Sequence, residues 1–376
     1  MIRSEIAFSF LIIILVSCSS KQEHRLSYDR EIYSPAYSSG YRISGEENSD
    51  NVLITSLNPW QGATDVASQL LIVRDSLSRL DSEENILKED AKRIITMSST
   101  HIAMLDALDA LDRIVGVSGK EYISNEKLMS SSKFIPDIGY EGNIDYEALV
   151  ATNPDLVLLF SVNGASAMEP KLKELGIPFI YIGDYVEESP LGKTEWIIPL
   201  AEIIGKREEG QKKFKEIEER YITLKDKVKS LKVSRPTVML NAPFGDSWFM
   251  PSTKSYVARM MEDAGADYIY KKNTGNSSLP IDLEAALMLV SHADYWLNIG
   301  TMDNLEEVKR NFPKFVKADC VQEGRLYNNN ARKSIGGGND CYESGVVNPD
   351  LILRDLVKIF HPELVEEDFV YYHKLE

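Results

Sequence analysis

The sequence predicts an α/β protein of two Rossmann-like lobes joined by a single long helix, with a ligand cleft between the lobes. Three observations lead to this prediction: an internal repeat, strand and helix patterns that alternate on both sides of residues 192–231, and a densely charged helical pattern inside that segment. The expected boundaries are an N-terminal lobe over residues 51–191, a connecting helix over 192–231 and a C-terminal lobe over 232–376.

The repeated unit is a helix that leads into a strand. Residues 144–148 read Ile-Asp-Tyr-Glu-Ala, and residues 281–285 read Ile-Asp-Leu-Glu-Ala. In each copy the Asp stands where a helix N-cap belongs, the Glu falls in the first helical turn, and a later Asp, Asp155 or Asp294, precedes an apolar strand. A repeat at this long separation, without any short period, indicates two similar lobes rather than a solenoid.

The segment between the lobes favours an exposed helix because residues 208–220 carry many charges at i,i+4 spacing. A helix of about 30 residues would reach roughly 45 Å, which is enough to bridge two lobes. Pro199 and Gly205 argue against one unbroken helix across the whole segment.

The first residues predict a signal peptide over residues 1–17. The apolar stretch from Ile6 to Val16 is shorter than the roughly 20 residues that a membrane-spanning helix needs. It ends in Leu-Val-Ser before Cys18, which resembles a bacterial lipobox. We therefore expect lipid attachment at Cys18 on the periplasmic side of a bacterial membrane, followed by a polar tether over residues 18–50. The alternative is an incidental cysteine.

The composition and the absence of common motifs argue against several classes of function. The 42 Lys and Arg stand against 58 Asp and Glu, a formal net charge of −16, which argues against a nucleic-acid partner. No phosphate-loop, HExxH, CxxC, GxSxG or GxGxxG signature occurs, and the run from Gly336 to Gly338 lacks the preceding strand and following Lys of a phosphate loop.

The two remaining cysteines, Cys320 and Cys341, flank a polar, Gly-rich loop. An oxidising compartment predicts a disulfide between them, which would contribute on the order of 3 kcal/mol by restricting the unfolded chain. The alternative is two free, buried thiols.

Several motifs together resemble a known family, the substrate-binding proteins of ABC importers for iron–siderophore complexes, haem and vitamin B12. Residues 93–101 and 112–117 are similar to its opening strand, helix and strand. Residues 144–157 resemble its segment ending in Pro-Asp-Leu-Val, and residues 346–364 its terminal helix with a His-Pro-Glu ending. The resemblance covers residues 92–364 and is weaker before them.

The resemblance implies ligand capture and delivery rather than catalysis, by two lobes that a rigid helix joins across a shallow cleft. It also implies docking to an ABC permease through one Glu at the tip of each lobe. These positions fall on Glu147 and Glu284, the glutamates of the repeat. Exposed carboxylates at a fixed separation suit recognition by arginines. The alternative is that both acids only stabilise their helices.

Ligands of open α/β sheets bind where strands end, so the loops after strands are the candidates for the cleft. The aromatic and polar candidates from these loops are Ser98, Ser99, Thr100, His101, Tyr122, Tyr140, Ser161, Asn163, Phe244, Trp248, Phe249, Asn329, Arg332 and Tyr342. Aromatic residues suit a large, flat ligand, and Arg332 suits an anionic complex. The alternatives are core packing for the aromatic loop and a solvated surface for the basic one.

The expected ligand is a chelated iron complex, either a siderophore or haem, with vitamin B12 (cobalamin) as the nearest alternative. Of the five histidines only His101 lies at a predicted cleft edge, which disfavours a site for a bare metal ion. We expect no resident cofactor and a monomer. A surface lipoprotein enzyme such as a hydrolase and an interaction module with a vestigial cleft are the alternatives from other classes.

Overall fold

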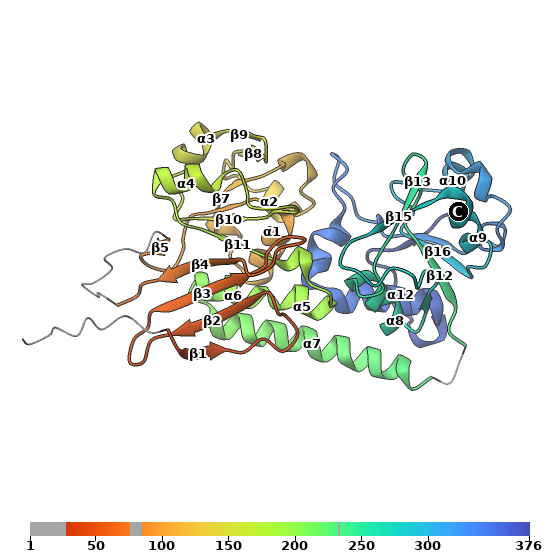
Figure 1. Ribbon diagram of the computed structural model, residues 1–376, viewed down its shortest axis with the longest axis horizontal. Coiled ribbons are helices and arrows are strands. Elements are labelled where there is room, and N and C mark those ends of the chain that lie inside the picture. Colours follow the sequence, from red (N-terminus) through yellow and green to blue (C-terminus); the bar gives the residue numbers. More distant parts are fainter. Residues whose placement is uncertain (1–27, 76–84, 232–233) are drawn as a thin grey trace, which may run out of the picture.

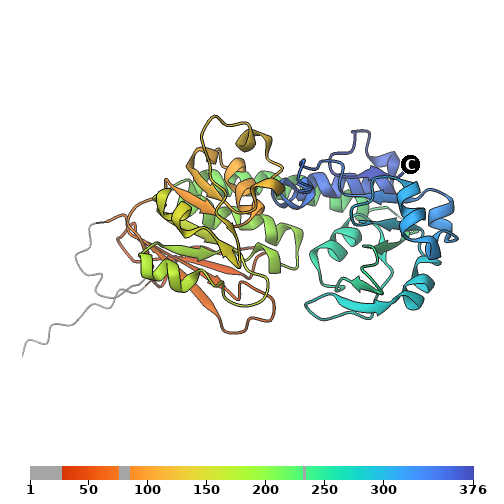
Figure 2. The same cartoon turned by 90° about the horizontal axis from the view of Figure 1, so that it is seen from above.

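The computed structural model describes residues 28–75, 85–231 and 234–376. Two α/β lobes lie side by side, and helix α7 (Arg207–Lys229) runs along both of them (Figure 1). Figure 2 shows the same two lobes from above. The predicted signal peptide and Cys18 lie outside the described residues.

Each lobe contains a parallel sheet with the same strand order. Counted by appearance in the chain, four strands of each lobe stand in the order 2-1-3-4, and the C-terminal lobe adds an antiparallel edge strand, β18. The strands are β6 (Ile94–Thr96), β7 (Ile114–Val117), β10 (Leu156–Leu159) and β11 (Phe179–Tyr181) in one lobe, and β12 (Thr237–Leu240), β14 (Asp267–Tyr268), β16 (Tyr295–Leu297), β17 (Leu326–Asn328) and β18 (His373–Lys374) in the other.

The repeated phrase has the same role in both sheets. Asp155 accepts hydrogen bonds from the backbone N–H groups of Lys92 and Arg93, at 2.9 and 2.8 Å, just before β6. Asp294 likewise accepts one from the backbone N–H of Thr237, 2.7 Å away, at the start of β12. In each lobe the aspartate thus ties the third strand to the first, and the predicted duplication is confirmed.

Helices surround these sheets. The N-caps predicted at Asp145 and Asp282 are confirmed because each accepts a backbone hydrogen bond, at 2.9 and 2.7 Å. The helices are α1 (Ser99–Ala107), α2 (Glu126–Met129), α3 (Tyr146–Ala151), α4 (Glu169–Leu175), α5 (Pro190–Glu195), α6 (Ile197–Ile203), α7, α8 (Tyr256–Asp263), α9 (Leu283–Val290), α10 (Leu305–Asn311), α11 (Asp319–Gln322) and α12 (Pro349–Phe360).

An additional antiparallel sheet, which we call the N-terminal sheet, precedes the parallel sheet of the N-terminal lobe. It consists of β1 (Arg30–Tyr33), β2 (Tyr41–Gly45), β3 (Val52–Leu57) and β4 (Ala67–Ile72), with β5 (Ile86–Leu87) pairing parallel to β4. Strands β3 and β4 form an antiparallel hairpin. Residues 30–45, expected to belong to a tether, instead form two strands, because β2 pairs with β3 along five residues.

A buried carboxylate holds this sheet against the lobe. Glu195 in α5 is fully buried, and it accepts hydrogen bonds from the Tyr33 hydroxyl at 2.8 Å and from the backbone N–H groups of Ala36, Tyr37 and Ser38 at 2.8, 2.9 and 2.7 Å. These four donors replace the water that the carboxylate loses on burial. Burial and this hydrogen bond together raise the pKa of Tyr33, so its hydroxyl remains a donor.

The helix that connects the lobes is shorter than the expected span of residues 192–231. Residues 190–229 form three separate helices, α5, α6 and α7. The helical structure is interrupted between α6 and α7 at Gly205, which has a left-handed φ of 71°. Pro199 is accommodated in the first turn of α6, where its missing N–H is not needed. Helix α7 alone spans the two lobes: its 23 residues correspond to about 35 Å. Its apolar stripe contributes Phe214 to the N-lobe core and Tyr221 to the C-lobe core.

The C-terminal chain forms a second tie between the lobes. Val346 and Val347 belong to the hydrophobic core of the N-terminal lobe, although α12 directly after them packs in the C-terminal core. The Val346 carbonyl accepts a hydrogen bond from the Thr194 hydroxyl at 2.7 Å. In Figure 1 the blue C-terminal segment accordingly reaches the N-terminal lobe beside α5. The lobes are therefore tied together here as well as along α7.

Replacing Glu195 with Gln should destabilise the protein by about 3 kcal/mol, because an amide NH₂ would face backbone N–H donors inside the fold. Urea unfolding measures this change. The exposed Glu216 of α7 provides the control, since Glu216→Gln should change stability by less than about 0.5 kcal/mol. Equal stability of both variants would contradict the role given to Glu195.

Candidate functional site

The carboxyl ends of the parallel strands of both lobes face a shared cleft. Ser98, after β6, caps α1 by accepting a hydrogen bond from the backbone N–H of Thr100 at 3.3 Å. In the C-terminal lobe, Asn241 follows β12 and Asn298 follows β16, both with positive φ, and both line the cleft. This placement agrees with the prediction that strand-end loops form the cleft.

Three cavities make up the cleft, and neighbouring cavities share lining residues. The large cavity, of about 650 Å³, lies between the N-terminal sheet and the C-terminal lobe. The central cavity, of about 330 Å³, shares Tyr256 and Tyr342 with it. The N-lobe cavity, of about 540 Å³, shares Ser98 and Phe160 with the central one. These volumes fall in the range of small-molecule sites.

The central cavity draws side chains from both lobes. Lys193 donates to the backbone carbonyl of Asp184 at 2.8 Å, and its ammonium lies 5.0 Å from the centre of the Tyr256 ring. Burial raises the pKa of Asp184, while Lys193 opposes the rise, and the Thr100 hydroxyl lies 3.4 Å from the Asp184 carboxylate. Burial also raises the pKa of Tyr256. The Tyr256 phenol therefore stays a neutral hydrogen-bond donor at physiological pH.

Exposed tyrosine rings are the most prominent feature of the cleft. Tyr122, Tyr140, Tyr185 and Tyr342 are between 40% and 61% exposed although each lines a cavity. Large aromatic surfaces that stay open to solvent in a concave site are available to stack on a ligand. The cleft is thus an aromatic and polar surface rather than a cluster of charges.

The structure brings together most of the predicted residues but not all. Ser98, Ser99, Thr100 and Tyr342 line the central cavity, Tyr122, Tyr140 and Asn163 the N-lobe cavity, and Asn329 the large cavity. Their contact with a ligand stays a prediction. The remaining six candidates, which line none of the three cavities, are His101, Ser161, Phe244, Trp248, Phe249 and Arg332.

Each of these six has another environment. His101 and Trp248 are fully buried, and Trp248 packs against Trp296 with ring centres 5.3 Å apart. The Ser161 hydroxyl donates to the carbonyl of Gly164. Phe244 and Phe249 are exposed around the two-stranded antiparallel sheet of β13 (Ser247–Met250) with β15 (Leu279–Asp282). Arg332 forms an ion pair with Asp340 at 3.1 Å, so its charge is already balanced.

Sequence reasoning missed several lining residues, above all Trp60, Asp184, Tyr185, Lys193 and Tyr256. Tyr185 and Asp184 follow β11, so the strand-end rule that selected Ser98 would also have selected them. Trp60 belongs to the β3–β4 loop of the N-terminal sheet, and no local signal places this loop beside the C-terminal lobe.

The expected disulfide is absent from the structure. Cys320 and Cys341 are free, buried thiols. Cys320 lies in α11, its sulfur 3.9 Å from the carbonyl of Val290, whereas Cys341 lines the central and large cavities. Spacing along the chain could not show that the two side chains point to different parts of the lobe. Burial raises the pKa of Cys320 to about 11.

The Gly-rich loop between these cysteines contacts the opposite lobe. The Ser334 hydroxyl donates to the carbonyl of Glu121 at 3.1 Å. Gly336 and Gly338 lie so close to the backbone of Glu121 and Tyr122 that a Cβ would fall 2.1 and 1.7 Å from their carbonyl oxygens. Close backbone approach, not phosphate binding, therefore accounts for these glycines.

Glu343, directly after this loop, also reaches the N-terminal lobe. Its carboxylate accepts a hydrogen bond from the backbone N–H of Ser124 at 2.7 Å, and burial raises its pKa to about 7.

The two predicted docking residues occupy equivalent positions. Glu147 is the second residue of α3 and Glu284 the second residue of α9, and both are exposed. Each follows a confirmed aspartate N-cap. Neither residue lines any of the three cavities, so a role in ligand contact is not expected for them.

Within residues 28–75, 85–231 and 234–376, no group of three or more His, Cys, Asp or Glu side chains is arranged to hold a metal ion. In the same part of the chain, no helix has the length and apolar character needed to cross a membrane.

Two α/β lobes meet at a cleft that is lined from both sides. A family model described as "Periplasmic binding protein" matches residues 94–332, well over half of the chain. The chain belongs to this periplasmic binding protein family.

Solved structures of other proteins are similar to this fold. A periplasmic haem-binding protein from Pseudomonas aeruginosa has a TM-score of 0.59 at 16% identity, with 76% of this chain and 98% of that one covered. An ABC-type Fe3+-hydroxamate transport system protein from Saccharomonospora viridis has a TM-score of 0.54 at 18% identity, with 72% and 93% covered. These likenesses show the fold.

Two relatives from Methanocaldococcus jannaschii are named as uncharacterized lipoproteins. Each is 26% identical to this chain. One match covers 76% of this chain and 69% of the relative, and the other covers 78% and 76%.

His101 should make folding less favourable in acid. Burial lowers its folded pKa from 6.5 to about 3, and neither ring nitrogen has a hydrogen-bond partner. Below pH 6.5 the unfolded chain binds a proton that the folded chain does not, so stability falls, by about 2 kcal/mol from this group at pH 5. Urea unfolding at pH 7 and pH 5 should show this loss in wild type and a smaller one in His101→Phe. The exposed His292 is the control: His292→Phe should keep the wild-type loss, and the same loss in all three proteins would contradict the assignment.

Proposed function

We propose that this protein is the solute-binding lipoprotein of an ABC importer, which captures a chelated iron complex, a siderophore or haem, and delivers it to a membrane permease. The observation that carries the proposal is the cleft between the lobes, lined by exposed tyrosines at the ends of parallel strands. The similar structures of a haem-binding protein and an Fe3+-hydroxamate transport system protein support the ligand class.

The chemistry of the cleft suits such a ligand. Chelated iron presents a large, partly aromatic or amide surface, and the tyrosine rings offer stacking faces together with phenol hydroxyls. The central Lys193 is already paired with Asp184 at 3.5 Å, so the cleft favours a ligand of low net charge. The proposed role is binding and release without chemical change, by a monomer without a resident cofactor.

Limited hinge motion follows from the double connection between the lobes. Helix α7 and the segment around Val346 both cross between the cores, which restricts how far the lobes can open. Ligand entry then depends on small adjustments at the cleft loops.

Lipid attachment through Cys18, on the periplasmic side of the membrane, is the second part of the proposal. The names of the two lipoprotein relatives support it. Membrane fractionation of cells that produce Cys18→Ser would test it, because loss of the acylated cysteine should release the protein from the membrane.

A thermal-shift screen tests the ligand class. Haemin or a ferric siderophore at 100 times its dissociation constant should stabilise the acyl-free protein by about 2.7 kcal/mol. Tyr342→Ala should weaken that ligand at least tenfold. Phe134→Ala, which removes an aromatic ring that is 84% exposed outside the three cavities, should not. A shift with cobalamin alone would assign the protein to cobalamin, and no shift with any of these ligands would refute the proposal.

Docking to the permease predicts a separation of binding from uptake. The double variant Glu147→Ala/Glu284→Ala should bind ligand as wild type does, yet support at least tenfold less uptake, because unpaired permease arginines would remain at the interface. Glu216→Ala/Glu219→Ala, which removes the same charge from the exposed face of α7, should keep normal uptake. Normal uptake by the first variant would show that these glutamates do not dock.

A further inference from the structure

The N-terminal sheet contributes to the cleft although it lies outside the family match, which begins at residue 94. Two of its loops line the large cavity: Tyr37, Ser39 and Gly40 come from the β1–β2 connection, and residues 58 and 60–64 come from the β3–β4 loop. The added sheet therefore enlarges the cleft on one side, and we call the surface formed by these two loops the added wall.

The added wall is held rigidly against the N-terminal lobe. The backbone N–H of Gln61 donates to the carbonyl of Val162 at 3.0 Å, and its side-chain amide donates to the Tyr185 hydroxyl at 3.1 Å. Trp60 packs edge-on against Tyr181 with ring centres 5.2 Å apart. A recognition surface that is ordered before binding loses little entropy when a ligand arrives.

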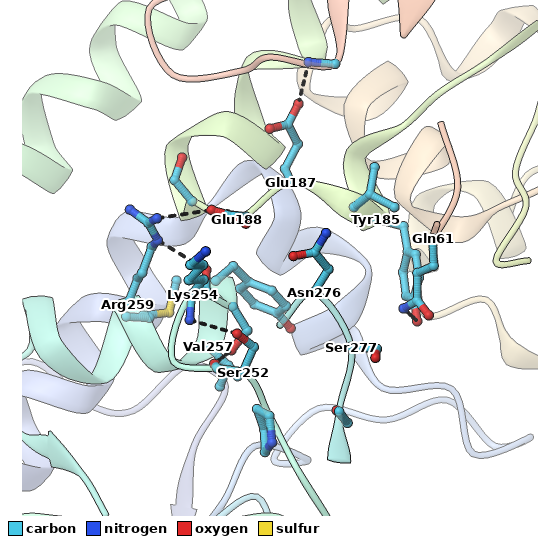
Figure 3. A pocket seen from close by; sticks show the side chains of 18 of the residues that line it. Gln61, Tyr185, Glu187, Glu188, Ser252, Lys254, Val257, Arg259, Asn276 and Ser277 are labelled. Carbon is cyan, nitrogen blue, oxygen red and sulfur yellow. Dashed lines mark hydrogen bonds and ion pairs between the residues drawn. The ribbon is translucent and has the colours of Figure 1, made fainter. Parts of the chain in front are cut away.

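The opposite wall comes from the C-terminal lobe. Ser252 and Lys254 precede α8, Arg259 lies within it, and Asn276 and Ser277 belong to the loop that leads to β15. Figure 3 shows Asn276 extending into the space between the Arg259 side of the cavity and the side formed by Gln61 and Tyr185. A molecule in this cavity would therefore contact both lobes and the added sheet.

The charged groups of the large cavity are largely satisfied. Arg259 forms an ion pair with Glu188 across the lobes at 3.2 Å (Figure 3). Glu187 accepts hydrogen bonds from the backbone N–H of Gly40 at 3.2 Å and from the Trp196 indole at 2.9 Å. Lys254 is exposed at the rim, where water solvates its ammonium. A charged ligand group would lose its hydration without gaining a dedicated partner.

The remaining lining groups suit a neutral polar molecule. Amides such as Gln61 and Asn276 offer both donors and acceptors, and hydroxyls such as Ser277 and Tyr185 do the same. Tyr185 is 40% exposed and supplies an apolar ring face beside these groups. This combination matches ligand parts that carry several hydroxyl or amide groups on a compact frame.

We propose that the large cavity is a second ligand subsite, built by the N-terminal sheet, which binds a neutral, hydroxyl- or amide-rich moiety between Gln61 and Tyr185 on one wall and Asn276 on the other. The proposal rests on the proposed function in that the moiety belongs to the ligand whose chelate occupies the adjoining central cavity. Tyr256 and Tyr342, which line both cavities, would contact both parts of such a ligand.

The first arm of the test uses metal-free fragments, so that it does not depend on an iron ligand. Methyl glucoside represents a sugar source and N-acetylglycinamide a peptide source, and saturation-transfer NMR measures their binding to the acyl-free mature chain. At least one fragment should bind. Gln61→Ala/Asn276→Ala should weaken it about tenfold, the effect of losing two hydrogen bonds. Gln69→Ala, an exposed amide on β4 of the same sheet, should bind as wild type does.

The second arm repeats the comparison with iron complexes. Ferrichrome, which carries a peptide ring, and haemin, which lacks a neutral polar moiety, are titrated by tryptophan fluorescence. If ferrichrome binds wild type, the double variant should weaken it about tenfold and leave haemin unchanged.

The outcomes separate the two proposals. Failure of both fragments to bind, or equal binding of the fragments or ferrichrome by wild type and the double variant, would overturn the subsite. Binding of a fragment that the double variant loses, without binding of any iron complex, would support the subsite and count against the proposed iron ligand. Circular dichroism confirms that the double variant is folded.

Discussion

The cleft depends on two hydrophobic cores being held at a fixed separation. Helix α7 enforces that separation because a single apolar stripe enters both cores, with Phe214 in one and Tyr221 and Val228 in the other. An α-helix cannot shorten or bend sharply without breaking backbone hydrogen bonds, so the lobes keep their distance. The ion pair of Arg220 with Asp350, at 2.6 Å, further ties the helix to α12.

A buried carboxylate extends this framework to the N-terminal sheet. Glu195 lies in α5, next to α7, and binds the segment from Tyr33 to Ser38 through four hydrogen bonds. Because this segment continues directly into the wall of the large cavity, one interaction fixes both the added sheet and part of the cleft. The Gly-rich loop and Glu343 make comparable contacts from the C-terminal lobe. The cleft is therefore bounded by groups whose positions are determined by polar contacts between distant segments, and this favours a preformed site over large closure.

Local sequence signals were sufficient for the repeated units. The N-caps at Asp145 and Asp282 and the strands after Asp155 and Asp294 were predictable because a cap, a first-turn acid and an apolar run act within a few residues. Strand-end loops likewise located Ser98, Tyr140 and Tyr342 at cavities. The same reasoning failed for Trp248, because an aromatic residue on a strand can face either side, and packing against the rest of the lobe decides which side is buried.

The sequence by itself determined the fold class, the duplicated lobes, the bridging segment and the strand-end origin of much of the cleft, because these depend on periodicity and on contacts between near neighbours. Only the tertiary structure decided which residues meet across long separations. It paired residues 30–45 into a sheet with β3, placed Trp60 and Tyr185 on one wall, and directed Cys320 and Cys341 to separate environments. Such choices depend on the packing of segments that are distant in the chain, and no local pattern records that packing.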